Sequence, residues 1–310
     1  MKEAIQQLKI AYDMIEALQG RSTSSKSMII TGDMHVGHKF ALHTGEYEKI
    51  PEKLQVLKRL WYEGRDRLMR ERASIFFING EPIDGDNRKE GGHQVWSTDY
   101  NDQMADARTL IQHYKMDAIG MNRGSNYHTT KDNTGFEEIL ANEIKDIAPV
   151  ITYHPFDDDI IKEFHVVEYT DTGHRKIRID DLFVCRIHDK VFHLMHHIGG
   201  SKWFSYLPTA LGREMANMVF FDGKLWKKED APSVIIRSHT HRFVKIEYAN
   251  TVGAVSPAWK IFDRFGLKSG MDAGTIGFLE IVVEQNGEIS TNKIMLSNED
   301  YPKLNIIEIS

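Results

Sequence analysis

The chain has almost no cysteine and no long apolar run. Its 310 residues include a single cysteine, Cys185, which excludes an internal disulfide framework and fits a reducing compartment, where we expect the thiol to be buried and inert. No window is apolar enough to span a membrane. Charged residues also interrupt the apolar residues of the N-terminal stretch 1–20, unlike those of a secretory signal. These absences favour the cytoplasm.

An excess of positive charge is missing as well. The sequence holds 39 lysines and arginines against 45 acidic residues, a formal net charge of -6. This balance argues against a positively charged surface that binds nucleic acid non-specifically. Any binding of a polyanion would need a local basic groove. Hydrophobic residues make up 41% of the chain and charged residues 27%, which is typical of a globular protein with a large core.

In the first half of the chain, short apolar segments alternate with helix-like ones. Strand-like runs at 28–31, 74–78 and 116–121 each end in a polar loop that leads into a segment with helical character. This alternation predicts βαβ units, in which ligands bind beyond the carboxyl ends of the strands.

The second half has a different character. From about residue 166, strand-like pieces follow one another closely, which suggests antiparallel hairpins packed as a second sheet. We therefore predict an N-terminal helix and linker at 1–26, then one α/β domain at 27–310 with two layers of sheet and helices outside.

Residues of the types that bind metal ions follow five of the apolar runs. One such cluster arises easily by chance and is often only a solvated turn, but five together are hard to dismiss. In "SHTH", two histidines one residue apart would face the same side if the loop continued the strand direction. Imidazole and carboxylate suit manganese, iron, zinc or cobalt, and so many candidates fit two ions better than one. The candidates are Asp33, His35, Glu81, Asp84, His128, His196, His197, His239 and His241.

The motifs "GDMH", "GEPID", "RGSNYH", "HH" and "SHTH", taken in this order from Gly32 to His241, resemble the pattern of the calcineurin-like metallophosphoesterases. That pattern runs Asp-x-His, Gly-Asp-x-x-Asp, Gly-Asn-His-Asp or Glu, a later His, and Gly-His-x-His. The third motif, "HHIGG" and the late "SPAWK" look most like phage- and prophage-encoded members. The resemblance implies a two-layered β-sandwich flanked by helices (αββα) and a dinuclear metal centre that hydrolyses phosphoesters.

The resemblance also implies roles for individual residues. One ion would be bound by Asp33, His35 and His241, the other by His239 with His196 or His197, of which we favour His196, and Glu81 would bridge the two ions. The bridging residue of the family is normally aspartate, so Glu81 is one methylene longer. The family's Asn-His pair is also altered, and Ser125 and Asn126 lie near its ligand position, with Asn126 our candidate ligand. His128 would either bind the second ion or protonate the leaving group.

Further side chains could support the site. Asp84 would orient a ligand imidazole, and Glu137 or Glu138 could do the same. Arg123 and Arg242 flank the site loops and could contact a substrate phosphate, although arginines in such places are as often solvated or ion-paired. Residues outside strand-end pairs are expected to be structural or exposed: His38, His43, His93, His113 and His154. Trp203, Phe204 and Tyr206 could stack a base or cover the core.

The expected function is metal-dependent phosphoester hydrolysis with two divalent transition metal ions, manganese first and zinc, iron, nickel or cobalt as alternatives. A phosphodiesterase acting on nucleic acid or nucleotides, DNA included, follows from the phage-type resemblance. Net acidity favours a small or single-stranded substrate over long duplex DNA. The alternatives are a phosphomonoesterase or protein phosphatase, and a metal-binding scaffold that has lost turnover, which Glu81 and the altered third motif suggest.

Overall fold

The computed structural model describes residues 25–68, 74–86, 91–114, 117–128, 135–148, 150–151, 168–171, 174–177, 179–199, 206–218, 231–248, 250–261, 268 and 273–303. The expected N-terminal helix lies outside these residues, as do His154, Trp203 and Phe204. Among the described residues, no helix combines the length and the apolar character that crossing a membrane requires.

The first sheet has six strands in the order β13-β12-β1-β2-β3-β4. Four of them are parallel to one another, and β12 joins β1 in the antiparallel sense, with β13 antiparallel to β12. The strands span Lys26–Thr31 (β1), Ser74–Asn79 (β2), Ala118–Asn122 (β3), Val150–Ile151 (β4), Gly277–Val283 (β12) and Ile289–Met295 (β13).

The second sheet has five strands in the order β10-β11-β9-β8-β7. It contains the expected hairpin of β7 with β8 and a second hairpin of β10 with β11, but not the hairpin expected from the pieces at 168–177. The sheet is mixed, because β9 is parallel to both of its neighbours. The strands span Leu182–Ile187 (β7), Lys190–Met195 (β8), Val234–Arg237 (β9), Val244–Tyr248 (β10) and Thr251–Val255 (β11). A separate pair is formed by β5 (Glu168–Asp171) and β6 (His174–Ile177).

The helices begin where the sequence offers suitable first turns. Pro51 precedes the short helix η1 (Glu52–Leu54), which leads into α2 (Gln55–Leu68), and proline suits a helix start because no intrahelical partner is lost. The side chain of Asp99 accepts a hydrogen bond from the backbone N–H of Asn101, which caps α3 (Tyr100–Gln112). The remaining helices are α4 (Phe136–Ile144) and α5 (Leu207–Ala216).

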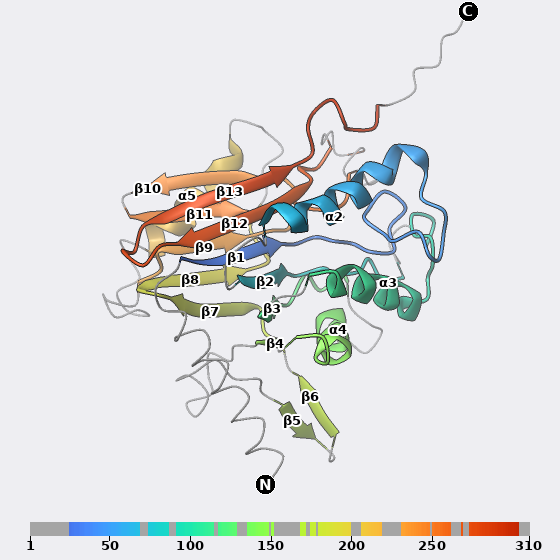
Figure 1. Ribbon diagram of the computed structural model, residues 1–310, viewed down its shortest axis with the longest axis horizontal. Coiled ribbons are helices and arrows are strands. Elements are labelled where there is room, and N and C mark those ends of the chain that lie inside the picture. The colour runs from blue at the N-terminus through green and yellow to red at the C-terminus, as the bar shows by residue number, and fades with distance from the viewer. Residues whose placement is uncertain are drawn as a thin grey trace, which may run out of the picture.

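Three apolar clusters define the layers. Met28 and Phe77 of the first sheet pack with Phe192 and Ile236 of the second, so the two sheets face each other. A larger cluster joins the other face of the first sheet to α2, α3 and α4 (Figure 1). A third cluster packs α5 on the second sheet. The expected α/β fold, with two sheets and helices outside, is confirmed. Cys185 of β7 is buried, and burial raises the pKa of its thiol.

Asp106 of α3 is a buried carboxylate that contributes a pH dependence to stability. It accepts hydrogen bonds from the backbone N–H and the hydroxyl of Thr44, and burial raises its pKa from 3.8 to about 6. The folded state therefore binds the carboxyl proton of Asp106 more tightly than the unfolded state does. The protonated carboxyl group stabilises the fold at low pH, and this stabilisation is lost as the pH rises from about 4 to about 6.

We expect Asp106→Asn to remove this dependence. The unfolding free energy of the wild type, relative to that of the variant, should fall by about 2 kcal/mol between about pH 4.5 and about pH 7.5. Urea unfolding followed by circular dichroism at several pH values measures this difference. A difference that does not change with pH would contradict the expectation.

Candidate metal centre

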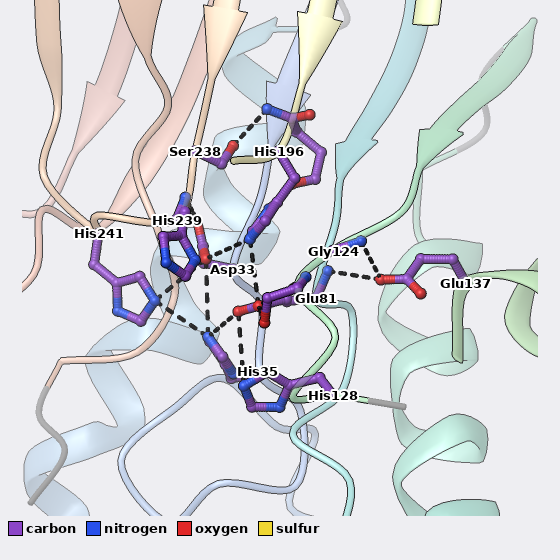
Figure 2. Close-up of polar contacts among 12 residues, drawn as sticks. Asp33, His35, Glu81, Gly124, His128, Glu137, His196, Ser238, His239 and His241 are labelled. Atoms are coloured by element: carbon purple, nitrogen blue, oxygen red, sulfur yellow. Dashed lines mark hydrogen bonds and ion pairs between the residues drawn. The ribbon is translucent and has the colours of Figure 1, made fainter. Parts of the chain in front are cut away.

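The ends of β1, β2, β8 and β9 bring together carboxylates and imidazoles from distant parts of the chain (Figure 2). Three groups could each hold a metal ion, and within each group the possible ligand atoms all lie within 4.8 Å of one another. The smallest group is His35, Asp84 and His128, and the two four-residue groups both contain Asp33 and Glu81. The two sets are Asp33, Glu81, His35 and His241, and Asp33, Glu81, His196 and His239. The two four-residue groups are adjacent and have both carboxylates in common.

The ligand atoms of the site face one another. His35 Nε2 lies 2.9 Å from Glu81 Oε2 and 3.2 Å from His241 Nε2. His241 Nε2 is also 3.2 Å from Asp33 Oδ1. On the other side, His196 Nε2 lies 3.3 Å from Glu81 Oε1. The two oxygens of Glu81 thus point towards different histidines, so its carboxylate lies between the two groups.

Five of these residues adopt an unusual backbone. Among the described residues, six non-glycine residues have a positive φ, and five of them are in the two groups: Asp33 (49°), His35 (48°), Glu81 (54°), His239 (71°) and His241 (57°). Left-handed backbone costs an ordinary residue about 1 to 3 kcal/mol and clusters at functional sites. The loop after β9 therefore turns and does not continue the strand direction. The prediction that its two histidines face the same side because side chains alternate along a strand is wrong in its reason.

Two glycines allow the loops to approach closely. Gly80, with φ +77°, lies so near His196 that a Cβ would come within 2.6 Å of its Nδ1. A Cβ on Gly124 would lie 2.6 Å from Cγ of Glu81 and 2.8 Å from its backbone nitrogen. Side chains larger than hydrogen at these positions would displace the loops that carry Glu81 and His196.

Hydrogen bonds orient the histidine rings. Asn79 O accepts a hydrogen bond from His196 Nδ1 at 2.7 Å, and because a carbonyl only accepts, the proton is on Nδ1 and Nε2 is left to bind an ion. His35 Nδ1 lies 2.9 Å from Asp84 Oδ1, which likewise turns its Nε2 inward. The sequence analysis assigned Asp84 such an orienting role, and this role stays a prediction.

Hydrogen bonds from the loops after β3 and β9 fix the two shared carboxylates, and Glu137 of α4 fixes the backbone beside one of them. Glu137 Oε1 accepts hydrogen bonds from the backbone N–H groups of Glu81 (3.0 Å) and Gly124 (2.9 Å). Ser125 donates both its backbone N–H, at 3.2 Å, and its hydroxyl to Glu81 Oε1. The backbone N–H of His239 donates to Asp33 Oδ2 at 2.9 Å. Both shared carboxylates are therefore fixed by neighbours from other loops.

The carboxylates of the site are ionised, and its imidazoles differ in their pKa values. Burial by itself raises the pKa of Asp33, but His241 and His196 outweigh it and the pKa falls to about 2. Burial likewise works against ionisation of Glu81, yet His128 and His196 hold its pKa well below the usual range. Burial lowers the pKa of His239 to about 4, which keeps this imidazole neutral near neutral pH, as a ligand must be. Burial also acts to lower the pKa of His196, but Glu81 and Asp33 raise it to about 10, so a metal ion would have to displace a proton from this imidazole.

The residues present fit divalent metal ions. Asp33 Oδ1 and His196 Nε2 are buried and form no hydrogen bond of acceptable geometry among the described residues, although His241 Nε2 and Glu81 Oε1 lie within 3.3 Å of them. Buried polar atoms are normally paired. Both atoms belong to the groups described above. A mixture of imidazole and carboxylate donors suits manganese, iron, zinc and cobalt.

Other predicted site residues lie at the edge of the centre or outside it. His197 is exposed, and its ring lies against that of His239, with 4.6 Å between centroids. Asn126 is also exposed, and its neighbour Ser125 is the residue that contacts Glu81. His128 is partly buried, and its Nε2 lies 3.9 Å from Glu81 Oε2. The structure therefore brings His128 to the centre and leaves Asn126 at the surface.

The two predicted substrate-binding arginines differ in their surroundings. Arg123 forms an ion pair with Glu138 of α4, and Arg242 is partly buried next to His241. Away from the centre, His38 is buried and accepts a hydrogen bond from the backbone of Phe40, while Tyr206 is exposed.

Sequence reasoning gave no role to two features of the site. The first is a chain of small polar side chains behind the ligands, in which Asn79 Nδ2 donates to Ser238 Oγ at 2.6 Å and Ser238 Oγ lies 2.6 Å from Ser256 Oγ. The second is Lys260, which is 6% exposed beside Asp84. The only sequence signal for either was that each follows an apolar strand, as the ligands do.

No family model matches the chain, and no curated protein matches it either. Solved structures show a weak likeness. An archaeal phosphodiesterase is 13% identical with a TM-score of 0.40, over 87% of this chain and 99% of that one. Vps29 from Entamoeba histolytica is 14% identical with a TM-score of 0.39, over 87% and 99%. A predicted phosphoesterase from Streptococcus pneumoniae is 9% identical with a TM-score of 0.31, over 88% and 98%. Values this low say nothing about activity.

Proposed function

We propose that this protein is a dinuclear metallophosphoesterase that hydrolyses phosphoester bonds. The observation that supports this most strongly is that Asp33 and Glu81 belong to both four-residue groups, because adjacent ions need carboxylates between them. When bound, two divalent ions would act as Lewis acids on a phosphoryl group and activate water near neutral pH. Manganese is our first expectation, with zinc, iron, nickel and cobalt as alternatives.

The protein's own groups would position the substrate and move a proton. His128 Nδ1 donates to the carbonyl of Asp84 at 2.8 Å, which leaves Nε2 on the side of Glu81. A proton on Nε2 could pass to the leaving oxygen, and an unprotonated Nε2 could instead bind an ion. Burial lowers the pKa of His128, so the acid role requires the substrate's negative charge to favour protonation.

The substrate we favour is a phosphodiester in nucleic acid or a nucleotide, and a small or single-stranded one because the chain is acidic overall. The phage-type resemblance of the motifs supports this choice. Arg242 borders the centre and could contact a phosphate, whereas Arg123 would have to do so while paired with Glu138. Phosphomonoesters or phosphoproteins are the second candidate substrates, and a metal-binding scaffold without turnover is the alternative to an enzyme.

Hydrolysis of bis(p-nitrophenyl) phosphate and p-nitrophenyl phosphate by metal-stripped protein, resupplied with manganese, zinc, nickel or magnesium, tests the proposal. Diester cleavage restored by a transition metal is the expected result. Cleavage of the monoester alone would favour the phosphatase, and inactivity with every metal would favour the scaffold.

A histidine variant assigns the activity to this site. His239→Ala should weaken metal binding by at least roughly tenfold to a hundredfold, the range seen when only a partner of a ligand is lost, and turnover should fall with it. His93→Ala is the matched control because His93 is exposed and in neither group. Equal activity of the two variants would place the reaction elsewhere.

A further inference from the structure

Lys260 is a buried lysine at the edge of the metal centre. It follows β11 and is 6% exposed, although lysine is almost never buried without a specific reason. The chain around it is fixed to the site loops, because the backbone N–H of Trp259 donates to Asp33 O at 3.0 Å and that of Ile261 donates to Phe40 O at 2.9 Å. Its position is therefore set by the same segment that carries Asp33.

The ammonium group acts on the site through its charge. Lys260 Nζ lies 3.9 Å from Asp84 Oδ1, too far for a hydrogen bond, and the same oxygen is 2.9 Å from His35 Nδ1. One carboxylate oxygen therefore links the ammonium group to a histidine of the centre. The lysine thus lies beside the loops that follow β1 and β2.

The sign of this charge identifies what it can stabilise. A fixed positive charge repels cations bound nearby and attracts anions, and both effects are large where water is excluded. Lys260 therefore opposes metal binding at the centre instead of assisting it. The nearest anion that Lys260 stabilises is the Asp84 carboxylate, 3.9 Å away. An anion bound on the ions would gain from the same charge, and for a phosphoesterase that anion is a phosphate group.

We propose that Lys260 is a positioning residue that uses its charge to hold the phosphate group of the substrate at the metal centre, without itself binding an ion. This inference rests on the proposed function for its substrate. This role differs from those of the candidate ligands and of Asp84. It predicts that removing the charge of Lys260 weakens phosphate binding without weakening metal binding.

The test uses inorganic phosphate and the manganese-loaded protein. Lys260→Met keeps the length of the side chain and removes its charge, while Lys260→Arg keeps the charge. In a medium with an effective dielectric constant of about 20, one unit charge changes the affinity for another about 10 Å away on the order of tenfold. Calorimetry should show phosphate binding about tenfold weaker in Lys260→Met and close to wild type in Lys260→Arg.

Manganese affinity, measured by competition with a chromophoric chelator, should be unchanged or higher in Lys260→Met. A parallel loss of manganese and phosphate affinity would overturn the inference, because that is what a merely structural role predicts. Unchanged phosphate affinity, or no phosphate binding by the wild type, would overturn it as well. If Lys260→Met does not fold, Lys260→Gln provides the neutral variant for the same comparison.

The outcome is separable from that of the proposed function. A wild type that binds manganese and phosphate but cleaves no ester would refute the hydrolase, while the phosphate affinities of the Lys260 variants would still decide the role of the lysine. Active protein with unchanged phosphate binding in Lys260→Met would support the hydrolase and refute the role of Lys260.

Discussion

Asp33→Asn is expected to release bound metal from both groups and to lower phosphoester hydrolysis at least roughly a thousandfold, about 4 kcal/mol of transition-state stabilisation. Asp33 is fully buried and belongs to both groups, so one substitution removes negative charge from two adjacent sites. Asparagine has nearly the same shape and tolerates the left-handed backbone at this position, φ 49°. The loss is therefore expected to come from charge and not from a changed fold.

Asp106→Asn is the matched control for this substitution. Asp106 is as deeply buried as Asp33, but it bonds to Thr44 and is in neither group. Metal content by elemental analysis and turnover of bis(p-nitrophenyl) phosphate should stay at wild-type values in this variant. An Asp33→Asn protein that retained both ions and full turnover would disprove the dinuclear assignment.

Gly124→Ala is expected to disrupt the centre through one methyl group. The added Cβ would lie 2.6 Å from Cγ of Glu81 and 2.9 Å from Oε1 of Glu137, closer than real Cβ atoms are found, so the loop that carries the carboxylate has to move. Overpacking of this kind costs about 1 to 3 kcal/mol of stability. A shift of about 1 Å at a reacting site can reduce turnover on the order of a hundredfold.

Melting temperature, manganese affinity and turnover together test this expectation. Gly199→Ala provides the matched control, because a Cβ at Gly199 would meet no heavy atom within 4 Å among the described residues. We expect the control to behave as the wild type in all three measurements. Full manganese affinity in Gly124→Ala would show that Glu81 does not need its observed position.

The sequence predicted the architecture well because its patterns are local. The apolar runs that became β1, β2 and β3 alternate with amphipathic segments, and this alternation can be recognised without knowing which strands pair. The mixed pairing of the second sheet could not be predicted in this way. The parallel neighbours of β9 are β8 and β11, and only packing decides which strands lie beside each other.

The candidate ligands were recognisable because each follows directly after an apolar strand, and carboxyl ends of parallel strands meet at one edge of a sheet. The sequence could not distinguish His196 from His197. In the structure, the first is buried with its Nδ1 bonded to Asn79 O, whereas the second is exposed. The choice depends on which side of the chain faces the other sheet.

By itself, therefore, the sequence determined the strand and helix pattern, the residue types at the strand ends and their order along the chain. The tertiary structure decided the left-handed backbone at Glu81, its hydrogen bonds with Ser125, and the burial of Lys260 beside Asp84. Local preferences disfavour a positive φ for glutamate and burial for lysine. Such features exist only because contacts between residues far apart in the sequence outweigh those preferences.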